Sequence, residues 1–251
     1  PTRQDRAGTI GTRLGISAAQ TGLHAQRTRR RQFVDGQGEA NAAAIVMAGG
    51  LTYWNSLSGP FILDDLVSIV DNEQIHQLWP PSAVLFPARE LSVAGRPVVN
   101  VSFALNYAFG GLDVAGYHVV NVAIHLCCAL LLFGIVRRTL VRLKPDPTYE
   151  GADWAGRSAN VALAVSLLWM LHPLQTEAVD YVTQRTELLM ACFYLLTLYA
   201  SIRAHEAAVV RSVRLQPDRR WVWQSLAVVA CALGMGSKES MVTAPIMVAL
   251  F

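Results

Sequence analysis

The sequence predicts an all-α, polytopic membrane protein. Hydrophobic residues make up 53% of the 251 residues and charged residues only 16%, and the mean hydropathy is +0.32. Soluble domains usually carry a charged share of about 25%. Here the charges are missing from a few long stretches rather than thinned evenly. This distribution excludes a disordered, collagen-like or coiled-coil chain.

Long uncharged runs predict the spanning helices, because a helix needs roughly 20 apolar residues to cross about 30 Å of hydrocarbon. The predicted spans cover about residues 40–63, 114–136, 158–176, 185–203 and 221–237, with an incomplete one over 240–251. The run 98–110 is too short to span. We expect it to form a helix at or near the membrane surface.

The basic residues predict the orientation, because loops rich in Lys and Arg stay in the cytoplasm. Of the 21 basic residues, 17 lie in the segments 1–39, 137–157 and 203–220. These segments are therefore predicted to be inside, with the N-terminus cytoplasmic and residues 40–251 forming the transmembrane domain. Residues 1–39 show no hydrophobic periodicity and predict a disordered basic anchor rather than a nucleic-acid site.

The outer segments hold ten of the 18 acidic residues, and two of these adjoin the first span. Asp64 and Asp65 could act as a general base and its partner, or as ligands of a divalent cation. They could equally be a helix N-cap followed by a solvated acid. The sequence does not decide between these readings.

Two further outer clusters are rich in polar groups. His172 and Glu177 open a segment that continues through Asp180 to Arg185, and an ordinary capped helix start is the slightly favoured interpretation there. Lys238 and Glu239 sit in a short turn between two apolar runs, and ionisable residues so close to hydrocarbon are usually paired or functional.

Polar residues also lie within the second predicted span. His118, Asn121 and His125 share one helix face. We expect this face to be a hydrogen-bonding seam between helices in preference to a metal site. The four cysteines all lie in apolar runs without a metal-ligand spacing, and we interpret them as packing residues.

Five ordered motifs carry a family resemblance across about residues 41–251. They read FILDDLVSIVDN, GRPVVNVSF, GYHVVNVAIH, HPLQTEAVDYVTQRTELL and SKES. The chain resembles the transmembrane and tetratricopeptide-repeat O-mannosyltransferases and their bacterial relatives. An aromatic residue is expected before the arginine of the second motif, where this chain has Gly95.

The resemblance implies a GT-C-like transmembrane part with a long first outer loop. It implies transfer of a sugar, mannose in the family, from a polyprenyl-phosphate donor to Ser or Thr hydroxyls of an acceptor protein at the outer face. It also implies a multi-pass protein of the bacterial inner membrane or the endoplasmic reticulum membrane, in contact with membrane lipids and not with nucleic acid. The need for a divalent cation stays open.

The resemblance also assigns roles to residues of this chain. Asp64 is the implied catalytic base, with Asp65 orienting it or the acceptor. The cations implied to bind the donor phosphate are Arg96, Arg185 and Lys238. The residues implied to shape the pocket are His172, Glu177, Glu239, His118 and His125.

The chain starts at Pro1, stops inside an apolar run and carries no 34-residue helical repeat, so we expect an N-terminal fragment. The alternative function is a non-catalytic membrane scaffold bearing such repeats. A transporter fits less well, because the acids cluster outside the spans and not near the membrane midplane.

Overall fold

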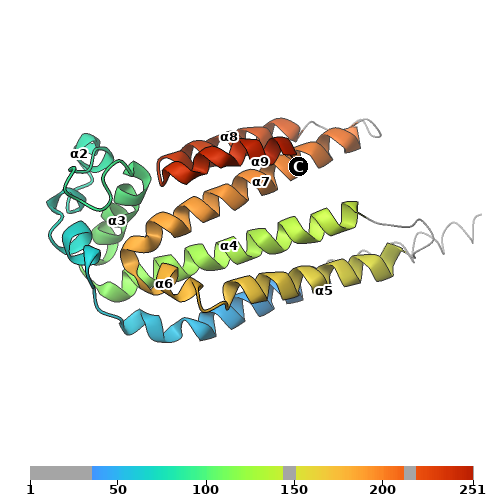
Figure 1. Cartoon of the computed structure of the whole chain (residues 1–251), viewed down its shortest axis with the longest axis horizontal. Helices are drawn as coiled ribbons and strands as arrows, with labels where there is room; N and C mark the ends of the chain where they lie inside the picture. Colours follow the sequence, from blue (N-terminus) through green and yellow to red (C-terminus); the bar gives the residue numbers. More distant parts are fainter. Residues whose placement is uncertain (1–35, 144–150, 212–218, 251) are drawn as a thin grey trace, which may run out of the picture.

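The computed structural model describes residues 36–143, 151–211 and 219–250, and all of its regular elements are helical. Most of residues 1–39 therefore lie outside the described part. The long helices run back and forth and form a bundle, and a cap of short helices covers one of its ends (Figure 1). The predicted all-α class is confirmed.

The first long helix covers residues 36–52, so it begins and ends earlier than the apolar run 40–63 predicts. A 3-10 turn, Trp54–Ser58, and an extended segment follow it. The Ser56 and Ser58 hydroxyls donate to the carbonyls of Tyr53 and Asn55, which offers the backbone an alternative to the helix ladder. Uncharged composition continues through this break, which is why the run overestimates the helix.

The cap contains α2 (Pro81–Leu85), α3 (Pro97–Gly110) and the short helical turns Leu66–Val70 and Glu73–Ile75. The predicted helix over 98–110 is thus present as α3. Its first residue is proline, which suits the first helical position because the missing N–H has no partner there. Gly111 ends it with a φ of 57°, a conformation that glycine adopts without a Cβ penalty.

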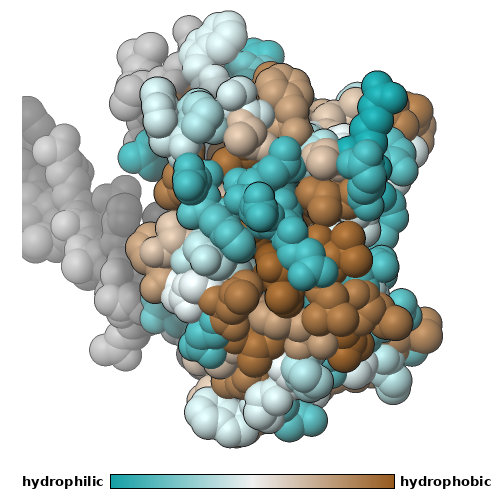
Figure 2. All heavy atoms as spheres, turned by 90° about the vertical axis from the view of Figure 1, so that its left-hand side faces the viewer, coloured by the Kyte–Doolittle hydropathy of each residue, from teal (hydrophilic) through white to brown (hydrophobic). Residues whose placement is uncertain are grey.

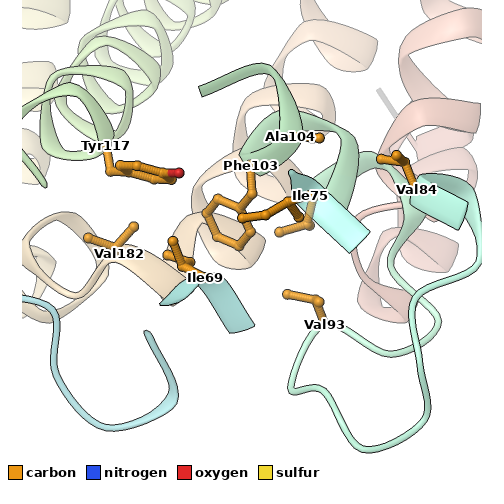
Figure 3. Close-up of a cluster of buried hydrophobic side chains, with 9 residues drawn as sticks. Ile69, Ile75, Val84, Val93, Phe103, Ala104, Tyr117 and Val182 are labelled. Atoms are coloured by element: carbon orange, nitrogen blue, oxygen red, sulfur yellow. The ribbon is translucent and has the colours of Figure 1, made fainter. Parts of the chain in front are cut away.

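A hydrophobic cluster holds the cap to the bundle (Figure 3). Ile69 and Ile75, from the two short helical turns of the cap, meet Phe103 of α3, Tyr117 of α4 and Val182, which precedes α7. All five residues are at most 1% exposed. Apolar burial therefore joins cap and bundle into one core.

The bundle is completed by four long helices and two short elements. They are α4 (Val114–Arg142), α5 (Gly151–Met170), α6 (Gln175–Asp180), α7 (Arg185–Arg211), α8 (Arg220–Met235) and α9 (Ala244–Leu250). The helix α5 ends before the predicted limit of 176, because the residue before Pro173 is disfavoured in a helix. The last run begins as a 3-10 turn, Glu239–Thr243.

Two helices of the described part are long and apolar enough to cross a membrane by length and composition, Val114–Arg142 and Val182–Ala208. The described helices alternate in direction, so that α4 ends where α5 begins, at the end opposite the cap (Figure 1).

The four cysteines are free thiols, and Cys127 and Cys192 face each other across α4 and α7 with sulfurs 3.7 Å apart.

Arg185, at the start of α7, is fully buried and bonds to two neighbouring elements, α3 and α4. Its guanidinium donates to Asn121 Oδ1 at 2.8 Å, to Asn106 Oδ1 at 2.9 Å and to the Tyr117 carbonyl at 2.9 Å. A longer contact of 3.3 Å reaches the Ser102 carbonyl. The guanidinium also lies 4.7 Å from the Phe103 ring centre. One side chain thus joins α3, α4 and α7.

We predict that Arg185→Met strongly destabilises the protein. The change leaves several buried acceptors unpaired, each at a cost of about 1–3 kcal/mol, so the free energy of unfolding should fall by about 3 kcal/mol or more. Unfolding in detergent measures it. The exposed Arg89 provides the control: Arg89→Met should change stability by about 0.5 kcal/mol or less. Equal effects of the two changes would contradict the role of Arg185.

Candidate functional site

The structure distinguishes the two neighbouring acids of the predicted first outer segment, residues 64–113. Asp65 is fully buried, whereas Asp64 is exposed. Asp65 Oδ1 accepts hydrogen bonds from both the backbone N–H of Thr183, at 2.7 Å, and its hydroxyl. Asp65 Oδ2 accepts from the Ile62 N–H at 3.1 Å. Asp65 therefore ties the first outer segment to the start of α7.

Asp64 is held by its backbone and presents its side chain at the surface. Its N–H donates to Tyr181 Oη at 3.0 Å. Burial, together with the carboxylates of Asp64 and Asp65, raises the pKa of Tyr181 above its ordinary value of 10.0. The phenol therefore stays protonated at neutral pH beside the Asp64 carboxylate.

Leu63, immediately before Asp64, has a φ of 47°. This left-handed conformation is uncommon for a residue with a branched side chain, and such strain clusters at functional sites. The Leu63 side chain is 73% exposed, so burial of the side chain does not compensate for the strain. The N–H of Ile62 before it donates to Asp65 Oδ2, and the N–H of Asp64 after it donates to Tyr181 Oη, and these two bonds fix the turn.

The three predicted phosphate-binding cations have different surroundings. Arg185 would have to leave its protein acceptors in order to bind a ligand. Arg96 is half-buried and donates to the Ser92 carbonyl at 3.1 Å. Lys238 forms a partly exposed ion pair with Glu187 of α7. Arg96 and Lys238 thus retain access to solvent, and Arg185 has none.

Arg96 and Lys238 come from segments that are neighbours in the fold. The N–H of Val98, in the first turn of α3, donates to the Gly236 carbonyl at 3.1 Å. A Cβ on Gly236 would lie only 2.8 Å from a methyl group of Val98, so the close approach requires glycine. The second motif therefore contacts the residue that immediately precedes the fifth motif, at the edge of the cap.

The residues predicted to shape a pocket divide into two groups. His172, Glu177 and Glu239 are exposed at the capped end, and the Leu174 N–H donates to His172 Nδ1 at 3.2 Å. His118 and His125 are buried in α4. The structure does not bring these two histidines to the surface that carries Asp64.

The face of α4 that carries His118 forms the predicted seam between helices. His118 Nε2 lies 3.2 Å from the Gly59 carbonyl, and His125 Nε2 lies 3.0 Å from the Met170 carbonyl. Asn121 donates to the carbonyl of Val179 at 3.3 Å and to that of Val182 at 3.4 Å. Across the residues that the structure describes, no group of three or more His, Cys, Asp or Glu side chains could hold a metal ion.

Sequence reasoning missed several polar residues that support the site. Asn72 of the first outer segment donates to Asn100 Oδ1 of α3 at 3.1 Å, and Asn100 donates to the Val84 carbonyl at 2.8 Å. Both asparagines are nearly or fully buried, at 2% and 0% exposed. The available signal was that both asparagines lie within the first and second motifs. A buried amide is usually hydrogen-bonded, so asparagines in motifs that become buried are candidates for such contacts.

The capped end has a polar centre. Figure 2 looks onto this end and shows hydrophilic side chains across its middle, with hydrophobic ones at their border. Large apolar side chains at the capped end are strongly exposed, among them Leu63, Trp79, Phe86, Phe109 and Leu174. Such exposed apolar area is typical of an interaction or membrane-contacting surface.

The fold and these residues define a class: an all-helical protein with membrane-type helices and an acidic, solvent-facing site at one end of the bundle. No family model matches the chain, and no solved structure matches it. Curated animal proteins do match, among them several that are named protein O-mannosyl-transferases.

Three of these relatives illustrate the match. The chain is 32% identical to Tmtc2 of Drosophila melanogaster over 79% of its length and 20% of the relative's. It is 29% identical to F38B6.6 of Caenorhabditis elegans over 68% of its own length and 24% of the relative's. It is 28% identical to TMTC3 of Mus musculus over 79% of its own length and 20% of the relative's. The chain thus spans a quarter or less of these relatives, and it belongs to the family of transmembrane and tetratricopeptide-repeat O-mannosyltransferases.

We predict that replacing Asp65 destabilises the protein, whereas replacing the neighbouring Asp64 leaves its stability almost unchanged. Asp65→Ala leaves the N–H groups of Thr183 and Ile62 unpaired and should lower the free energy of unfolding by about 2–3 kcal/mol. Asp64→Ala should change it by about 0.5 kcal/mol or less, because the side chain is exposed. Thermal unfolding in detergent compares them. Equal losses would show that Asp65 is not a structural clamp.

Asp180, the last residue of α6, provides a pH test. Its Oδ1 is buried and lacks a hydrogen-bond partner among the described residues. Burial raises the pKa of Asp180 above its ordinary value of 3.8, although the nearby His118 partly opposes this. The folded protein thus holds this proton more tightly than the unfolded chain, and the contribution of Asp180 to stability falls as pH rises from 3.8 through the folded value.

Asp180→Asn should therefore become more favourable relative to the wild type as pH rises. Thermal unfolding at about pH 4 and about pH 7.5 measures this: the Tm of Asp180→Asn minus the Tm of the wild type should be larger at the higher pH. The control is Asp71→Asn, which alters an exposed carboxylate of the first outer segment. A Tm difference for Asp180→Asn that does not vary with pH would contradict this assignment.

Proposed function

We propose that this chain supplies the catalytic part of a membrane glycosyltransferase that moves a sugar from a polyprenyl-phosphate donor to a Ser or Thr hydroxyl of an acceptor protein. The observation that carries the proposal is the difference in burial between two neighbouring acids. Asp65 is buried and hydrogen-bonded, while Asp64 is exposed on a turn that Asp65 holds in place. The relatives' shared name supports glycosyl transfer, with mannose as the sugar.

Asp64 is the general base in this mechanism. Its carboxylate takes the proton of the acceptor hydroxyl while the hydroxyl oxygen attacks the anomeric carbon. A new carbon–oxygen bond forms, and the bond between the anomeric carbon and the phosphate oxygen breaks. The lipid phosphate leaves with the bonding electrons. One displacement of this kind inverts the anomeric centre.

The leaving phosphate requires positive charge close to the membrane. We assign this role to Arg96 and Lys238, which lie on adjoining segments at the edge of the cap and retain exposure. Lys238 would exchange Glu187 for the phosphate. Arg185, fully buried among protein acceptors, becomes a positioning residue in place of a phosphate ligand.

The remaining residues act around this centre. Tyr181 holds the backbone of Asp64 and keeps its proton beside the carboxylate. His172, Glu177 and Glu239 are exposed at the same end of the bundle and are proposed to contact the acceptor or the sugar. His118 and His125 support the helices beneath. The proton transfer to Asp64 as written uses no divalent cation, and the exposed carboxylates of Asp64, Glu177 and Glu239 are all accessible to one.

The proposal places the chain in a bilayer as a multi-pass protein. The described helices alternate in direction, and the predicted outer segments collect at the capped end (Figure 1). The N-terminal side then lies in the cytoplasm, as the distribution of basic residues predicts. The exposed apolar residues of the cap would lie at the membrane surface.

We predict that Asp64→Asn abolishes transfer in the full-length protein. Removing a general base typically costs a factor of about 10²–10⁴ in rate. The assay follows sugar from polyprenyl-phosphate mannose into Ser/Thr peptides in purified membranes, with matched expression.

The control is Asp71→Asn, since Asp71 is an exposed acid of the same outer segment without an assigned role. It should retain wild-type transfer. Full activity in Asp64→Asn would overturn the mechanism. A wild-type full-length protein that transfers no sugar would overturn the enzymatic proposal and favour a scaffold.

A further inference from the structure

A hollow lies at the end of the bundle away from the cap. It has a volume of about 1080 Å³ and lies between the last turns of α4, the facing part of α7, and residues near the starts of α5 and of the helix over 36–52. The outer acids and the family motifs at the capped end take no part in it. Its lining therefore needs a separate explanation.

The hollow is apolar at one end and cationic at the other. Leu130 and Phe133 of α4 line its inner part, and Arg137, Arg138 and Arg142 line the part nearer the helix end. The stretch from Leu130 to Arg142 covers roughly 18 Å along a helix. A ligand that fits both parts has an apolar body and an anionic head.

Three guanidinium groups and one carboxylate line the cationic part. Arg138 Nη1 lies 2.6 Å from Glu206 Oε2, so one positive charge is compensated. Arg138 also lies over the ring of Tyr199, 5.4 Å from its centre, and this contact fixes its direction. Arg142 donates to the Ile202 carbonyl at 3.2 Å. Among the lining residues that the structure describes, guanidinium groups outnumber carboxylates.

Arg137 is the residue most ready to accept a ligand. Among the residues that the structure describes, it has no hydrogen-bond acceptor and no ion-pair partner, and it is half-buried. A Cβ on Gly38 would lie 2.6 Å from Arg137 Nη1, so the guanidinium rests against the first long helix. Packing thus holds a charged group at the hollow without satisfying its charge.

The position of these arginines matches the headgroup level of a bilayer. They follow the apolar part of α4, the more hydropathic of the two membrane-type helices. Basic residues at such a helix end lie at the membrane interface, and basic pockets between helices bind anionic lipid headgroups. Charge and shape both favour a phospholipid.

We propose that this hollow binds an anionic phospholipid, with its phosphate on Arg137 and Arg138 and an acyl chain along Leu130 and Phe133. The inference rests on the membrane placement in the proposed function, but it is independent of sugar transfer. The lipid would fill the space between α4 and α7 and hold the two helices at a fixed separation.

The test uses the full-length protein in detergent, stripped of endogenous lipid. Phosphatidylglycerol is titrated, and native mass spectrometry and the Tm report binding. We expect a saturable bound lipid and a rise in Tm for the wild type. Arg137→Gln should weaken binding about fivefold, because one basic residue contributes about 1 kcal/mol to anionic lipid binding. Arg137→Lys, which keeps the charge, should retain most of it.

Arg89→Gln is the matched control, since it removes the same charge from an exposed site in the cap. It should bind phosphatidylglycerol like the wild type, and so should Asp64→Asn, which separates this test from the catalytic proposal. Equal binding by Arg137→Gln and the wild type would overturn the inference. So would equal binding of phosphatidylcholine, a Tm rise with inorganic phosphate alone, or a full-length protein whose other segments fill the hollow and exclude lipid.

Discussion

The fold of the capped end depends on one buried charge. A guanidinium without water must find acceptors, because an unpaired buried charge costs several kcal/mol. Arg185 finds them on α3 and α4, and the rings of Phe103 and Tyr117 cover its faces. The same two helices also pack together in the hydrophobic cluster around Phe103 and Tyr117. The buried charge and this cluster together determine how cap and bundle meet.

This constraint prepares the site without taking part in its chemistry. Two residues before Arg185, Thr183 binds the buried carboxylate of Asp65. The predicted first outer segment is thereby fixed to the start of α7, and the side chain of Asp64, the residue before Asp65, is exposed at the surface. Two chemically identical neighbours thus acquire different roles through burial alone, one as a clamp and one as the proposed base.

The sequence was a good guide to helices and a partial guide to the site. Uncharged runs located the long helices, and the spacing of His118, Asn121 and His125 predicted the seam that α4 forms. The break after residue 52 escaped prediction because apolar composition continues beyond it. Arg185 was expected to bind phosphate, since the motif carries its charge but not its burial. Burial arises from contacts between distant segments, which a local pattern does not contain.

The central claim is that Arg185 aligns the outer segments, and amide hydrogen exchange tests it most directly. The comparison is between the wild type and Arg185→Lys, whose single ammonium reaches fewer acceptors. We predict faster exchange together at Ile62, at Thr183 and in the first turns of α3, with α5 unchanged. Unchanged protection at Ile62 and Thr183 would contradict the account, because the Asp65 clamp would then form without Arg185.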